Sequence, residues 1–168
     1  MGLLVMAVLG WQVFQRELSF DAASGALRFT HGIDLVIHEA GHVFALVFPR
    51  FFHILGGSAL QVILPAVCAL TFLHQRHLGS FAVALFWTGE SITDVAIYMA
   101  DAKTQALPVL GGDGTVHDWN YLLGQLHLLG WAPSLARLTF GAGILLITAA
   151  LAIVANETHR AWLRAVRS

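Results

Sequence analysis

The sequence predicts an all-α integral membrane protein, a polytopic helical bundle formed by one domain over residues 1–168. Hydrophobic residues make up 57% of the chain and charged residues only 11%, and the mean hydropathy is +0.72. A typical soluble domain is about a quarter charged, so the charge here is too sparse to cover a water-facing surface. The apolar residues also gather in stretches long enough to cross a bilayer. We therefore expect a multi-pass protein, with the cell membrane as the favoured location and the lipid bilayer as its first partner.

Charge and cysteine usage exclude some classes and leave others open. The net charge is −1 and no basic stripe is present, so nucleic acid is not an expected partner. The only cysteine, Cys68, cannot form a disulfide within the chain. The nine histidines equal Lys plus Arg in number, which in so apolar a chain indicates metal binding or proton handling.

The first thirty residues predict two small elements. Residues 3–14 are apolar but fall short of the roughly 17 to 25 residues that a span needs, so they predict a tilted first helix or part of one. Residues 17–30 contain two short alternating segments around "AASG", which predict a small β-hairpin at the membrane surface. An irregular interfacial loop fits that segment equally well.

The remainder of the chain predicts about four full spans and one short helix. Four apolar stretches are each long enough to cross a hydrocarbon core about 30 Å thick; they are residues 33–49, 54–73, 80–100 and 135–155. Residues 119–131 are too few to span alone and follow a glycine-rich polar loop at 101–118. A helix that begins within the bilayer is tolerated where the preceding loop packs in protein, so we expect a re-entrant-type helix there.

The motif that carries chemistry is "HEAGH", residues 38–42, inside the first of these stretches. Residues four apart lie on one face of a helix, so His38 and His42 can reach one metal ion. Glu39 lies beside that face and can act as a general base on a metal-bound water. Ionisable residues inside a span are rare and usually functional. The pattern predicts one zinc ion per chain, with His38 and His42 as ligands and Glu39 as the catalytic residue. The alternative is a pair of histidines hydrogen-bonded to other spans.

A catalytic zinc needs a third protein ligand and an open fourth position. The candidates are Asp94, Asp113, His117 and Asp118. His117 is preferred, because it stands where the short helix begins and imidazole is a good zinc ligand; Asp94 and then Asp113 follow. Asp118 is better placed to cap that helix.

Other polar residues fall at helical spacing and predict a polar face that points into the bundle. They are Glu90, Asp94, Tyr98 and Asp101. The metal site is their expected target, and bonding to one another is the alternative. Asp34 could orient His38, although a helix-start role is favoured. Residues 55–61, "LGGSALQ", predict close helix packing, and Gln61 could reach the cavity.

An H-E-x-x-H inside an apolar helix, followed by later spans and the Asp-Gly loop "LPVLGGDG", resembles the site-2 protease-like intramembrane metallopeptidases (M50-type). That resemblance implies a zinc-dependent endopeptidase that hydrolyses peptide bonds of transmembrane or membrane-proximal substrates. It implies His38 and His42 as ligands, Glu39 as base, and an aspartate ligand at the position of Asp113. The leucine that precedes this aspartate in the family is Gly112 here, so a compact, divergent member is expected.

Two other functions remain open. Intramembrane His, Asp and Glu also line transport routes, so a metal-ion or proton transporter is the first alternative. The second is a catalytically inactive relative that keeps zinc as a structural element. Glu39 separates them from a peptidase, because only hydrolysis needs a base beside the metal ligands.

Overall fold

The computed structural model describes residues 2–16, 18, 25–107 and 116–167, and their regular structure is entirely helical. Six α-helices and one short 3₁₀ helix follow one another: α1 (Gly2–Gln15), α2 (Gly25–Phe44), α3 (Arg50–His74), α4 (Leu78–Ala100), α5 (Asp118–Gln125), η1 (Leu129–Trp131) and α6 (Ala132–Arg167). The all-α prediction is confirmed for this part of the chain. The predicted helix at residues 3–14 lies within α1. The predicted short helix at residues 119–131 is present only in its first part, as α5, and a turn and η1 follow it.

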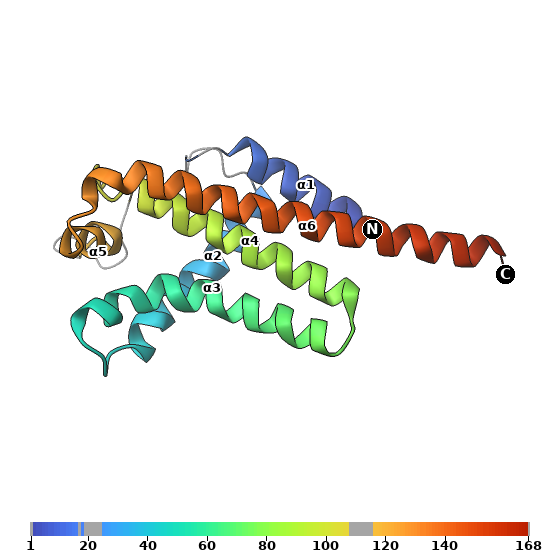
Figure 1. Ribbon diagram of the computed structural model, residues 1–168, viewed down its shortest axis with the longest axis horizontal. Helices are drawn as coiled ribbons and strands as arrows, with labels where there is room; N and C mark the ends of the chain where they lie inside the picture. The colour runs from blue at the N-terminus through green and yellow to red at the C-terminus, as the bar shows by residue number, and fades with distance from the viewer. Residues whose placement is uncertain (1, 17, 19–24, 108–115, 168) are drawn as a thin grey trace.

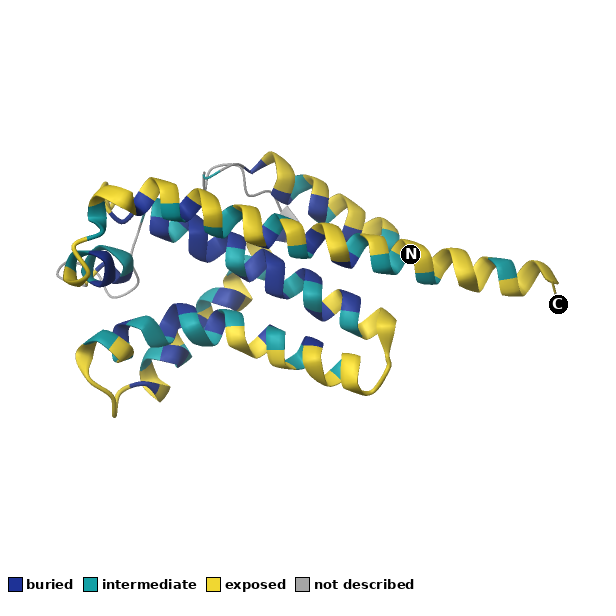
Figure 2. Ribbon diagram, in the orientation of Figure 1, coloured by how far each residue is buried: buried dark blue, intermediate teal, exposed yellow. Residues whose placement is uncertain are grey.

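Helices α4 and α6 pack side by side along much of their length and form the centre of the molecule (Figure 1). Helix α1 packs against α6 on one side of this pair. Helix α3 packs against α4 on the other side. Aliphatic and aromatic side chains from α1, α4 and α6 make one core, with Val13 and Ile147 completely buried. Figure 2 shows the buried residues concentrated on α4, whereas the end of α6 projects from the bundle and is mostly exposed.

Helices α2 and α3 cross at very short distance because glycines face each other. A methyl group added to Gly56 would lie 2.6 Å from the carbonyl oxygen of Gly41 and 2.5 Å from the Cβ of Ala45. The predicted close packing of the "LGGSALQ" segment is thus observed, and it holds the end of α2 against the start of α3.

Among the described residues two helices, not four, are long and apolar enough to cross a membrane: α3, and η1 with α6 over Leu129–Arg167. In their most apolar windows 33% and 17% of the residues are buried. Their outward faces carry large apolar side chains, including Phe52, Leu70, Leu138 and Leu145. Such surfaces fit lipid rather than water.

The other two predicted spans, 33–49 and 80–100, were wrong as spans for different reasons. The first lies partly in α2, a 20-residue helix that contains Arg28, Asp34 and Glu39 and ends at Phe44, and residues 45–48 form turns. The second forms α4, but its apolar run is interrupted by buried polar groups that face the bundle.

The predicted β-hairpin was also wrong where it can be examined. Residues 25–30 form the first turns of α2, with Leu27 fully buried, so helix packing overrides their weak alternation. Residues 17 and 19–24 lie outside the described part of the chain.

Candidate metal centre

His38, His42 and Asp118 come together where α2, α3 and α5 meet. The Oδ2 atom of Asp118 lies 2.8 Å from Nε2 of His38 and 3.2 Å from Nε2 of His42. The two imidazole rings are nearly perpendicular, at 74°, with their centroids 4.9 Å apart. Two ligand atoms, each about 2.0–2.1 Å from a tetrahedral zinc ion, lie roughly 3.3 Å apart. The three atoms therefore have a spacing close to that of ligands on a single ion.

The outer nitrogen of each ring has a partner that fixes its tautomer. Nδ1 of His38 lies 3.1 Å from Oε1 of Gln61, and Nδ1 of His42 lies 3.1 Å from the backbone carbonyl oxygen of His53. Both partners are oxygen atoms, so a proton on each Nδ1 satisfies them and leaves Nε2 as the metal-binding nitrogen. Both Nε2 atoms face the Asp118 carboxylate, and a cation that displaced the Nε2 protons would be bound by all three atoms. Such outer partners are usual for metal-bound histidines.

Gly57 leaves the room that an ion needs. A methyl group on Gly57 would lie 2.5 Å from Nε2 of His38 and 2.6 Å from Nε2 of His42. No side chain larger than hydrogen fits at this position while both rings keep their places. Helix α3 thus presents bare backbone to the Nε2 atoms of His38 and His42, in the segment for which the sequence predicted close helix packing.

Asp118 is positioned by contacts that dock α5 onto its neighbours. The indole Nε1 of Trp119 donates to Oγ of Ser58 on α3 at 3.2 Å, and the amide of Asn120 donates to the carbonyl oxygen of Ala102 at 2.8 Å. The backbone N–H of Asp118 donates to the hydroxyl of Tyr98 at 3.2 Å. Burial raises the pKa of the Asp118 carboxyl, but its hydrogen bonds with His38 and His42 lower the pKa more, so it stays below its ordinary value. The low pKa favours the ionised carboxylate form of Asp118.

His117, the preferred third ligand from the sequence, faces the other way. Its Nδ1 accepts from the backbone N–H of Asn120 and so caps α5, and its Nε2 lies 3.3 Å from Oδ2 of Asp101. The two adjacent residues exchange the roles that the sequence predicted for them: His117 caps the helix and Asp118 joins the histidine pair.

Asp101 anchors the polypeptide that leads from α4 toward this centre. Its carboxylate accepts from the backbone N–H groups of Ala106 and Leu107, each at 2.9 Å, as well as from the hydroxyl of Thr104. Burial raises the pKa of Asp101, but these hydrogen bonds outweigh burial and hold it below its ordinary value. Asp101 thus fixes both this turn and the ring of His117.

The remaining candidates lie apart from the histidine pair or cannot be placed. Asp94 pairs with Arg16 and His31 instead. Asp34 accepts from Trp87 and Ser91 rather than from His38, so neither of its predicted roles is observed. Asp113 lies outside the described residues. The predicted polar face of α4 is split: Tyr98 accepts from Asp118 and Asp101 contacts His117, whereas Glu90 and Asp94 face Arg16.

Glu39 is exposed beside the ligands. It follows His38 on α2, and its carboxylate makes no hydrogen bond within the described part of the chain. An exposed carboxylate next to two metal ligands can accept a proton from a water molecule at the open position. An exposed carboxylate thus follows His38 directly in the sequence.

The site includes residues that sequence reasoning missed or underrated. No pattern in the sequence placed His53 at the site, yet its carbonyl oxygen faces His42 and its Nδ1 lies 3.0 Å from the His42 carbonyl oxygen. Gly57 was interpreted as a packing residue. His53 and Gly57 both lie in the first turns of α3, the helix that follows the H-E-x-x-H helix after Pro49. This position was the one sequence feature that could have indicated their place at the site.

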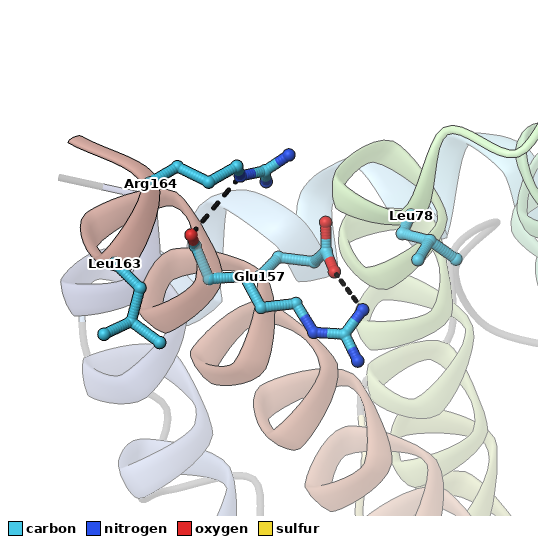
Figure 3. A pocket seen from close by; sticks show the side chains of 5 residues that line it. Leu78, Glu157, Leu163 and Arg164 are labelled. Atoms are coloured by element: carbon cyan, nitrogen blue, oxygen red, sulfur yellow. Dashed lines mark hydrogen bonds and ion pairs between the residues drawn. The ribbon is translucent and has the colours of Figure 1, made fainter. Parts of the chain in front are cut away.

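The pocket at the far end of α4 offers no comparable chemistry. It has a volume of about 460 Å³ and lies between Leu78 and the last turns of α6 (Figure 3). Its polar groups are Glu157, Arg160 and Arg164, joined by an exposed ion pair of 3.9 Å and a bond to backbone. We therefore treat the histidine pair as the candidate site.

Comparison with known proteins finds no matching family model, no matching curated protein and no matching solved structure.

Proposed function

We propose that this protein is a membrane-embedded zinc hydrolase that cleaves peptide bonds of transmembrane or membrane-proximal substrates. One observation carries the proposal: Nε2 of His38, Nε2 of His42 and Oδ2 of Asp118 converge beside an exposed glutamate, opposite a glycine that leaves space. The donor set of two imidazoles and one carboxylate is typical of catalytic zinc, with a fourth position for water. The resemblance of the motif to site-2 protease-like enzymes supports the same chemistry.

In this proposal each residue has a defined task. His38, His42 and Asp118 hold the ion, while Gln61 and the His53 carbonyl keep the two rings in the ligating tautomer. A bound zinc ion would supply Lewis-acid activation of a water molecule and of the substrate carbonyl. Glu39 accepts a proton from the water as its oxygen bonds to the carbonyl carbon. The same carboxyl then returns a proton to the leaving amine as the C–N bond breaks.

An aspartate as third ligand agrees with the family that the sequence resembles, whereas the histidine preferred from the sequence would have differed from it. In that family the third ligand is also an aspartate, on a loop before a later helix. Here Asp118 takes the role at the first position of α5, five residues after the aspartate that the motif alignment favoured. The substrate would approach along the apolar surfaces of α3 and α6, the two helices able to lie in lipid.

A transporter of metal ions or protons is the second candidate, favoured by the buried charges of Arg16, Glu90 and Asp94 away from the metal centre. Glu39→Gln separates the two functions. In a peptidase this variant keeps zinc and loses cleavage of a quenched-fluorescent single-span peptide in detergent by about 10²–10⁴-fold. Unchanged cleavage in Glu39→Gln would contradict the proposed role of this residue. Zinc uptake into vesicles that Glu39→Gln leaves intact, without any cleavage by the wild type, would favour the transporter. Zinc retention with neither activity would indicate the inactive relative.

A further inference from the structure

A second polar centre lies inside the bundle, between α1, α2 and α4, and takes no part in holding the metal. We call it the Arg16 cluster; its members are Arg16, His31, Asp34, Glu90 and Asp94. Arg16 and Asp34 are 0% exposed, Glu90 is 1% exposed and Asp94 is 4% exposed. Charged groups so deeply buried need partners of opposite charge or must lose their charge.

Asp94 has its partners. A guanidinium nitrogen of Arg16 donates to one carboxylate oxygen, and Nδ1 of His31 lies 2.7 Å from the other. Arg16 reaches Glu90 less closely, at 3.7 Å. The only guanidinium among the members thus lies closest to Asp94.

Asp34 and Glu90 receive hydrogen bonds mainly from neutral groups. Asp34 accepts from the indole of Trp87 at 2.8 Å and from the hydroxyl of Ser91 at 3.0 Å. Oε1 of Glu90 accepts from the hydroxyl of Thr30 at 3.1 Å. Oε2 of Glu90 is buried and has no hydrogen-bond partner among the described residues. One carboxylate oxygen from each of Asp34, Glu90 and Asp94 lies within 4.8 Å of the other two, so the three carboxyl groups form one cluster.

The charges of the cluster do not balance if every carboxyl is ionised. Three carboxylates face one guanidinium and one imidazole, so a negative charge remains even when His31 is protonated. Helix α6, which packs against α4, contributes no titratable group to the buried face: its buried residues are Ala132, Ala136, Gly143, Ile147 and Ala150. The buried polar groups of α3, Ser58 and Gln61, bond to Trp119 and His38 at the metal centre.

We propose that Asp34 and Glu90 form a proton-binding site that holds one exchangeable proton between them at neutral pH. The proton cancels the surplus negative charge of the cluster. It also removes the cost of burying an unpartnered charged oxygen, Oε2 of Glu90. A metal cation is less suited to this place, because the Arg16 guanidinium already lies against two of the three carboxyls. This inference stands apart from the proposed function, since neither residue ligates the metal.

Infrared spectroscopy of the detergent-purified full chain tests the site. At neutral pH the wild type shows the carbonyl band of a protonated carboxylic acid, which shifts in D₂O and disappears at high pH. Glu90→Gln and Asp34→Asn each remove one carboxyl, restore the charge balance and abolish the band. Glu157→Gln, a change on the exposed end of α6, leaves it in place. Absence of the band from the wild type, or a band that either cluster variant leaves unchanged, overturns the proposal.

Thermal unfolding gives a second readout that does not depend on the band. Glutamine has the shape of protonated glutamic acid, so Glu90→Gln keeps the wild-type Tm at neutral pH or raises it. Asp94→Asn removes the carboxylate that compensates Arg16 and lowers the Tm. If Glu90→Gln lowers the Tm as much as Asp94→Asn does, Glu90 is an ionised partner of Arg16 and the proton site is refuted.

Discussion

Replacing Gly57 by alanine adds one methyl group at the point where the account places the metal ion. The new Cβ would lie 2.5 Å and 2.6 Å from the coordinating nitrogens of His38 and His42, whereas an ordinary van der Waals contact is 3.4 Å or more. The three atoms nearest to the new Cβ all belong to the two imidazole rings, so the substitution disturbs the rings before it disturbs the packing of the helices. Either the rings or the methyl group must move.

The size of the effect follows from that overlap. Each nitrogen falls short of an ordinary contact by about 0.8 to 0.9 Å. Metal–ligand distances tolerate only about ±0.2 Å, so a shift of this size removes both imidazoles from the ion together. Loss of a single outer partner typically weakens binding 10–100-fold. We therefore expect Gly57→Ala to weaken zinc binding by at least about 100-fold.

The assay is zinc affinity by competition with a chromophoric chelator, together with the helix content and Tm of the zinc-free protein. Gly141→Ala on α6 is the matched control, because a methyl group there meets nothing within 4 Å. This control should bind zinc like the wild type, and its Tm should be unchanged or raised, since alanine favours helix over glycine. Wild-type zinc affinity in a folded Gly57→Ala variant would refute the placement of the ion between the two rings.

Two further predictions concern the groups that hold the ligands. Gln61→Leu removes the acceptor of His38 Nδ1 and should weaken zinc binding roughly 10–100-fold, measured in the same competition assay; unchanged affinity would mean that Gln61 does not orient the ring. Asp101→Asn should lower the Tm of the zinc-free protein at pH 7. The folded-state pKa of Asp101 is depressed, so its contribution is present above the unfolded value near 3.8 and is lost as the pH falls through the folded pKa. The Tm difference between wild type and variant should therefore narrow below about pH 4, and a difference that stays constant down to pH 2 would contradict this origin.

Local spacing predicted that His38 and His42 share a helix face, but it did not predict that Asp118 joins them. His38 and His42 share a face because any helix places residues four apart together, whatever surrounds it. His117 and Asp118 are adjacent, and which of them points at the pair depends on how α5 is rotated. That rotation is set by Trp119 on Ser58 and by Asn120 on Ala102, contacts between segments that are far apart in the sequence.

Burial of the charged groups was equally hard to predict. Arg16 follows a short apolar helix and looks like an interfacial residue, yet it is completely buried against Asp94, 78 residues away. The periodicity of α4 correctly indicated a polar face that points inward. It did not indicate that half of this face meets α1 and the other half meets the metal centre.

Hydropathy predicted the membrane class more securely than the number of spans. The stretches 54–73 and 135–155 lie within α3 and α6, which meet the length and hydropathy of a span. The stretches 33–49 and 80–100 carry His38, His42, Asp34, Glu90 and Asp94, which are polar groups of the two buried clusters. Polar residues that face the inside of a bundle lower the mean hydropathy of their helix, so such a helix no longer meets the hydropathy of a membrane span.

The most direct test of the central claim is the zinc content per chain of protein purified without chelators, measured by elemental mass spectrometry in the wild type, Asp118→Ala and His117→Ala. The account predicts about one zinc ion in the wild type and in His117→Ala, and loss of zinc in Asp118→Ala. Zinc that is lost in His117→Ala and kept in Asp118→Ala, or a wild type without metal, would contradict it.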